Sequence, residues 1–83
     1  MIRIKNVIPK SDYRLEVQLE NGSSVTLDFS SRLNTVRFAM LADKEFFQRA
    51  VTDGDFVRWA NKIEISVSEV FQLAQKENFK RDK

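Results

Sequence analysis

Residues 12–29 decide the fold, and they read Asp12-Tyr13-Arg14-Leu15-Glu16-Val17-Gln18-Leu19-Glu20-Asn21-Gly22-Ser23-Ser24-Val25-Thr26-Leu27-Asp28-Phe29. Apolar residues alternate with polar or charged ones on both sides of Asn21-Gly22, as in strands that bury one face and expose the other. Asn-Gly favours a tight hairpin turn because both residues tolerate the positive φ that such a turn needs. The stretch therefore predicts an antiparallel hairpin.

Alternation on either side of this hairpin predicts further strands. Residues 2–5 alternate and stop before Pro9, which cannot donate to a sheet ladder, so we expect an edge strand there. Residues 56–59 and 63–67 alternate as well and predict a second hairpin that turns at residues 60–62.

Two helices are predicted from capping signals. Asp43 can cap a helix over residues 44–51, which Gly54 would end. Ser66 and Glu69 have the spacing of a capping box, which would start a last helix over Val70, Phe71, Leu73 and Ala74. We therefore predict an α+β fold, a small antiparallel or mixed sheet of about five strands with two to three short helices on one face.

Composition excludes several classes of site. The chain has 83 residues with no Cys and no His, which rules out a thiol nucleophile, an imidazole base and a zinc site built on Cys or His. We expect one domain over residues 1–79, followed by a charged tail over residues 80–83. No apolar run approaches the ~20 residues that cross a bilayer, and the N-terminus lacks a signal-like core, so we expect a cytoplasmic protein.

The basic pI near 9.2 belongs to the tail. Residues 1–79 carry 11 basic and 11 acidic side chains, and residues 80–83 supply the net charge of +2. Nucleic-acid binding is therefore possible but not favoured, because the domain itself offers no general attraction for phosphate.

Five carboxylates on or beside the predicted strands are candidates for acid–base chemistry. Acid–base catalysis by a pair of carboxylates needs one of the two to be removed from water. Here the carboxylates alternate with apolar residues, which places them on the solvent-exposed face of the strands. We expect surface charges and cross-strand pairs with Arg14 and Arg58, no enzyme activity, no metal and no cofactor. The five are Asp12, Glu16, Glu20, Asp28 and Glu64.

Large aromatic side chains are unusually frequent, with seven Phe, one Trp and one Tyr. Each buries on the order of 150–250 Å², so they either form an aromatic-rich core or lie partly against a partner. Trp59 alternatively packs in the core or at its rim, with its indole N–H hydrogen-bonded. The partner-contact candidates are Phe46, Phe47, Trp59, Phe71 and Phe79.

The order of landmarks resembles the domain-of-unknown-function family numbered 2442, short proteins of bacteria and their phages. The resemblance covers about residues 2–71 and departs from the family pattern at Lys62, where Gly is usual, and at Glu64, where Asp is usual. Lys at a positive-φ position is disfavoured, so we expect the turn to be built differently. The landmarks are Ile4, Val7, Pro9, Asp12-Tyr13-Arg14-Leu15, Asn21-Gly22, Asp28, Leu33, Phe38, Leu41, Asp43, Phe47, Trp59-Ala60-Asn61, Glu64-Ile65 and Ser68-Glu69.

The resemblance implies a small α+β domain, found alone or joined to helix-turn-helix segments, in an arrangement similar to toxin–antitoxin pairs. Together with the aromatic surplus, it predicts a small protein-interaction module that self-associates as a homodimer or acts as the antitoxin-like partner of another small protein. Two alternatives remain open at this point: a nucleic-acid-linked transcriptional regulator, and a small-ligand-binding domain without catalysis.

Overall fold

The computed structural model describes the backbone of residues 2–81 and the side chains of residues 2–76. Its first sheet has the order β1 (Ile4–Lys10), β2 (Arg14–Leu19) and β3 (Ser24–Asp28), all antiparallel. The second sheet has the order β4 (Ala50–Thr52), β5 (Phe56–Trp59) and β6 (Ile63–Ser66), also antiparallel. The helices are η1 (Ser11–Tyr13), η2 (Ser30–Arg32), η3 (Ala39–Ala42), α1 (Lys44–Phe47) and α2 (Val67–Arg81).

The predicted hairpin is confirmed as β2 and β3. Leu15 pairs with Leu27 and Val17 with Val25, so the apolar residues of both strands share one face. The turn differs in detail, because Gly22 takes a positive φ of 93° and Asn21 does not. Asn21 instead accepts a hydrogen bond from the backbone N–H of Ser23 through Oδ1, at 3.0 Å. Asn-Gly therefore forms the turn with only one residue in the left-handed region.

The first strand is longer than predicted and includes Pro9, which pairs with Leu15. Pro9 has no N–H to donate. Because β1 is at the edge of its sheet, no hydrogen bond between central strands is lost.

The helix predicted over residues 44–51 is wrong in its second half. Asp43 does cap α1, since its Oδ1 accepts from the N–H of Glu45 at 3.0 Å and of Phe46 at 3.4 Å. The helix ends after one turn, however, and residues 50–52 form β4 against β5. Pairing with a neighbouring strand outweighs the helical spacing of Ala50 and Val51, and Gly54 serves the β4–β5 turn instead of a helix end.

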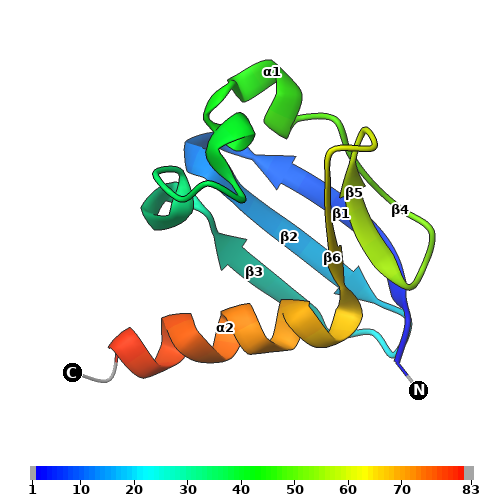
Figure 1. Ribbon diagram of the computed structural model, residues 1–83. Helices are drawn as coiled ribbons and strands as arrows, with labels where there is room; N and C mark the ends of the chain where they lie inside the picture. Colours follow the sequence, from blue (N-terminus) through cyan, green and yellow to red (C-terminus); the bar gives the residue numbers. More distant parts are fainter. Residues whose placement is uncertain (1, 82–83) are drawn as a thin grey trace.

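The α+β class is confirmed, with six strands in two sheets rather than five in one. The sheets meet where β1 lies beside β4, and the N–H of Ile4 donates to the carbonyl of Gly54 at 2.8 Å. Helix α2 contacts β3 and β6 and covers the side on which the sheets diverge (Figure 1). Within the described chain, no helix is long and apolar enough to cross a membrane.

The core lies between the two sheets and is strongly aromatic. Phe29 is at its centre, with edge-on contacts to Phe38, Phe47 and Trp59 at centroid distances of 5.3, 6.0 and 5.7 Å. Four of the nine aromatic residues are buried here, and Tyr13 and Phe46 pack partly against them, in agreement with the aromatic-rich core considered above. The buried apolar residues are Ile4, Val7, Leu15, Val17, Leu19, Leu27, Phe29, Phe38, Leu41, Phe47, Val57, Trp59, Ile63, Ile65, Val70 and Leu73.

Candidate interaction surface

The aromatic residues named as contact candidates lie in different environments. Phe47 is 1% exposed and Trp59 is 0% exposed, so neither presents its side chain to a partner in this fold. The indole Nε1–H of Trp59 donates to the carbonyl of Phe47 at 3.0 Å, as expected for a buried Trp. Phe46 is half-buried against the core, and Phe71 on α2 is 39% exposed. The side chain of Phe79 lies outside the described residues.

The outer face of the second sheet carries a more informative set of residues. Strand register places Val51 opposite Arg58 and Arg58 opposite Glu64, in one row across β4, β5 and β6. Phe56 lies on the same face as Arg58, two residues away, and is half-buried. Val51 is 58% exposed, so an aliphatic side chain is largely uncovered beside a fixed cation. We call these four residues the outer face of the β4–β6 sheet.

Arg58 is held in place by three neighbours. Its Nε donates to Glu64 at 2.9 Å, its Nη1 forms an ion pair with Asp53, and its guanidinium lies 5.0 Å from the centre of the Phe56 ring. This bears out the expectation that Arg58 pairs with a carboxylate across the strands. A side chain fixed in this way loses little conformational freedom when a partner binds to it.

The turn before β5 contributes the second carboxylate. The backbone N–H groups of Asp55 and Phe56 both donate to Asp53 Oδ1 at 3.0 Å. The Asp55 N–H, then Arg58, then the Phe56 N–H lower the pKa of Asp53 to about 2. The carboxylates of Asp53 and Glu64 conversely raise the pKa of Arg58, so Arg58 and Asp53 both stay ionised throughout the neutral range.

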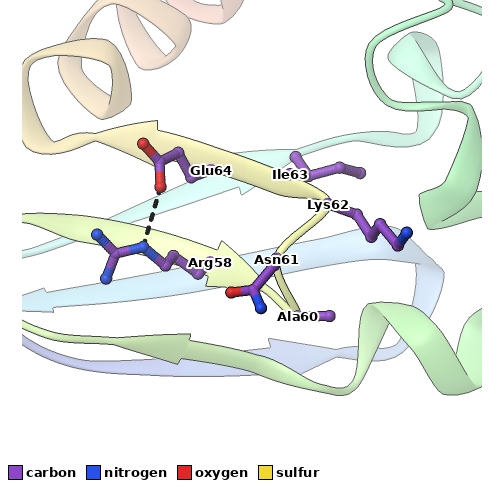
Figure 2. A pocket seen from close by; sticks show the side chains of 6 residues that line it. All are labelled: Arg58, Ala60, Asn61, Lys62, Ile63 and Glu64. Carbon is purple, nitrogen blue, oxygen red and sulfur yellow. Dashed lines mark hydrogen bonds and ion pairs between the residues drawn. The ribbon is translucent and has the colours of Figure 1, made fainter.

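The β5–β6 turn forms a shallow hollow of about 270 Å³ at the end of this face (Figure 2). Within this turn the residue with positive φ is Ala60, at 53°, and not Lys62. Lys62 therefore avoids the strained conformation. Its side chain extends away from Arg58 and Glu64 (Figure 2). The lining residues are Arg58, Ala60, Asn61, Lys62, Ile63 and Glu64.

Four of the described carboxylates are held in their charged form by hydrogen bonds. Each one with a resolved shift has a lowered pKa, because hydrogen bonds favour its charged form, whereas a general acid at neutral pH needs a raised one. Among residues 2–76 no three His, Cys, Asp or Glu side chains cluster in a way that could hold a metal ion. The carboxylates with lowered pKa are Glu16, Asp28, Asp53 and Glu69.

Sequence reasoning named Arg58 and Glu64 but missed Val51 and Asp53 as surface residues. The helix predicted over residues 44–51 would place Val51 on the same face as Phe47, four residues before it, and so turn it inward. The signal that could have found it is the β-branched pair Val51-Thr52 directly before the turn residues Asp53-Gly54, which is typical of a strand followed by a hairpin.

Comparison with known proteins places the chain in a family. A comparison with curated proteins finds no match. Among solved structures, a protein of Nitrosomonas europaea that is called a putative DNA-binding protein is similar, with a TM-score of 0.77 and 22% sequence identity. The match covers 94% of this chain and 52% of that one, so the chain spans about half the length of the similar protein. Residues 4–75 match the model of the family described as a protein of unknown function, DUF2442, and the chain belongs to this family.

Proposed function

We propose that the chain is a non-catalytic protein-interaction module whose contact surface is centred on the outer face of the β4–β6 sheet. Its partner is a second copy of the chain or another small protein. The single observation that carries this proposal is Val51, an aliphatic side chain 58% exposed beside Arg58, whose position three neighbours fix.

The chemistry of this face resembles the centre of a protein interface. Interfaces are enriched in Arg and aromatic residues, and their central contacts are apolar groups that exclude water. Here Val51 and Phe56 supply the apolar contact, while Arg58, Asp53 and Glu64 offer both signs of charge. A surface with both signs can be complementary to itself across a two-fold axis, which favours pairing of two copies.

The size of the face sets the strength that we expect. Three strands of three to four residues, about 3.4 Å per residue and about 4.8 Å apart, span on the order of 150 Å². A stable specific interface covers about 800 Å² on each partner. The face therefore supplies only the centre of a contact, and we expect a weak, concentration-dependent complex.

The test is the solution mass by light scattering, at two protein and two salt concentrations. We expect the mass to rise toward twice 9.7 kDa at the higher protein concentration, with little dependence on salt because the centre is apolar. Val51→Glu buries a charge in that centre and should weaken association at least about tenfold.

Val36→Glu is the matched control. Val36 is 98% exposed and lies between η2 and η3, outside the four residues of the outer face, so the substitution introduces the same charge at a different surface position. A mass of one chain under every condition would overturn self-association. Equal weakening by both substitutions would overturn the assignment of the surface.

A second candidate function, a nucleic-acid-linked regulator, is favoured by the name of the similar Nitrosomonas europaea protein. That name belongs to a chain about twice as long, and residues 1–79 of this chain carry equal numbers of basic and acidic side chains. Fluorescence anisotropy of a labelled duplex DNA at about 50 and about 200 mM salt distinguishes the two functions, because phosphate contacts lose affinity steeply over that range.

A further inference from the structure

A second hollow, of about 190 Å³, lies between the β1–β2 turn and α1. It is separate from the outer face of the β4–β6 sheet. At about 30 Å³ per water molecule it has room for roughly six waters, which limits a ligand to about one ring with a small substituent. The hollow is lined by Lys10, Ser11, Asp12, Tyr13, Lys44, Phe47 and Gln48.

The backbone beneath the hollow has an unusual conformation. Asp12 and Tyr13 are consecutive and take φ values of 63° and 62°, in the left-handed region that residues with a Cβ adopt at a cost. The Tyr13 hydroxyl donates to the carbonyl of Ala42 at 2.6 Å, and its ring packs edge-on against Phe47 at 5.6 Å. These contacts hold the turn in a conformation in which the Tyr13 ring packs against α1 and lines the hollow.

The polar rim of the hollow has groups without partners. The ammonium of Lys44, the side-chain amide of Gln48 and the carboxylate of Asp12 form no hydrogen bond or ion pair with any residue of the described part of the chain. Lys10 differs, because its Nζ lies 3.0 Å from Glu16. Lys44 is therefore the cation that is available to a ligand.

We propose that this hollow binds a small aromatic monocarboxylate, with its ring against Tyr13 and its carboxylate on Lys44. The ammonium of Lys44 and the amide of Gln48 are point donors that suit a carboxylate. Asp12 on the same rim disfavours a dianion by repulsion, so the site selects a single negative charge over a phosphate monoester. The proposal does not depend on the interaction surface, since none of these residues lies on it.

The test is titration of the full chain with benzoate, followed by amide ¹H–¹⁵N NMR. We expect saturable shifts at Tyr13 and Gln48, with weaker binding of benzyl alcohol, which lacks the charge, and of phenyl phosphate, which carries two. Lys44→Gln removes the charge-assisted hydrogen bond and should weaken benzoate binding about tenfold.

Lys76→Gln is the matched control, because Lys76 is exposed on α2 and has no partner among the described residues. It should leave the benzoate affinity unchanged, and the same spectra show whether each variant is folded. Three results would overturn the proposal: no saturable shift at Tyr13 and Gln48, equal affinity for benzyl alcohol, or equal affinity in Lys44→Gln.

Discussion

The two sheets share one design on their inner faces and differ on their outer faces. Both bury apolar side chains toward the common core. The outer face of the β1–β3 sheet is mostly polar, with Gln18 donating to Glu16 and Lys10 paired with the same carboxylate, and its aliphatic residue opposite Glu16, Ile8, is half-buried. The outer face of the β4–β6 sheet instead exposes Val51 beside a fixed Arg58. A polar face is explained by solubility alone, whereas an exposed aliphatic group on a fixed charged frame favours contact with a partner.

The sheets also differ in what holds them in place. The strands of the first have seven, six and five residues, and those of the second have three, four and four. Short strands gain little from their own ladder, so the second sheet depends on packing against the rest of the molecule. Trp59 is the main link, because it is fully buried, contacts Phe29 and Phe47, and donates to the Phe47 carbonyl.

The largest expected effect is therefore that of Trp59→Ala. Loss of the buried ring and of its hydrogen bond should lower the free energy of unfolding by about 3–5 kcal/mol, measured by urea denaturation. A domain of this size has about 4–12 kcal/mol in total, so Trp59→Phe provides a milder variant that stays measurable. Phe71→Ala is the control, because Phe71 is 39% exposed and should cost about 1 kcal/mol or less. Equal losses of unfolding free energy from Trp59→Ala and Phe71→Ala would contradict the conclusion that Trp59 holds the second sheet to the rest of the molecule.

Alanine substitutions at the two turn glycines test the same difference between the sheets. Gly22 in the β2–β3 turn of the first sheet and Gly54 in the β4–β5 turn of the second have φ values of 93° and 101°, so alanine is strained at both, by about 1–2 kcal/mol. Around Gly22 the space is open, whereas a Cβ on Gly54 would lie 2.1 Å from Nη2 of Arg3. Arg3 donates to Asp55 at 3.0 Å and to the Asp53 carbonyl at 3.2 Å, and it would have to leave both. Gly54→Ala should therefore cost about 0.5–1 kcal/mol more than Gly22→Ala.

A double-mutant cycle with Arg3→Ala checks that assignment by thermal or urea unfolding. Once Arg3 is shortened, the cost of Gly54→Ala should fall to that of Gly22→Ala, since only the backbone strain remains. An unchanged difference would mean that Arg3 does not rest against Gly54.

The difference between the sheets also explains how much the sequence could predict. The first hairpin follows from local chemistry, since alternation and a turn pair lie within 18 consecutive residues. β4 does not, because Phe46, Phe47, Ala50 and Val51 also satisfy the spacing of a helix. Which pattern prevails depends on β5 as a pairing partner, and only the tertiary structure provides it.

Candidate surface residues were predicted less well for a related reason. Aromatic content showed that large apolar groups were present but not which of them the core could hold. Phe47 and Trp59 became core residues through contacts to Phe29, a residue distant in sequence from both. The capping signal at Ser66 was local and correct, since its Oγ accepts from the N–H of Glu69 at 3.2 Å. The Glu69 carboxylate binds Arg37 at 2.9 Å, and the Ser66 N–H makes a smaller contribution to its lowered pKa.

The smallest expected effect is a change in carboxylate pKa. It distinguishes the two sheets by which group lowers the pKa of a carboxylate in each. Asp53 has a pKa of about 2, against an ordinary 3.8, first because the Asp55 N–H donates to it and then because of Arg58. Glu16 has a lowered pKa first because of the Lys10 side chain. Since the folded-state pKa of Asp53 is the lower one, its contribution to stability is complete above about pH 5 and is lost as the pH falls through 3.8 to about 2 and below.

Carboxyl ¹³C NMR against pH measures both groups directly. Arg58→Gln should raise the midpoint of Asp53 but leave it below 3.8, because the Asp55 N–H remains in place. Lys10→Gln should return Glu16 further toward its ordinary 4.5, since a side chain is its main stabilising partner. A full return of Asp53 in Arg58→Gln would mean that side chains, not the β4–β5 turn, hold this carboxylate. The ion pair with Arg58, and not the backbone of the turn, would then fix the carboxylate beside Val51.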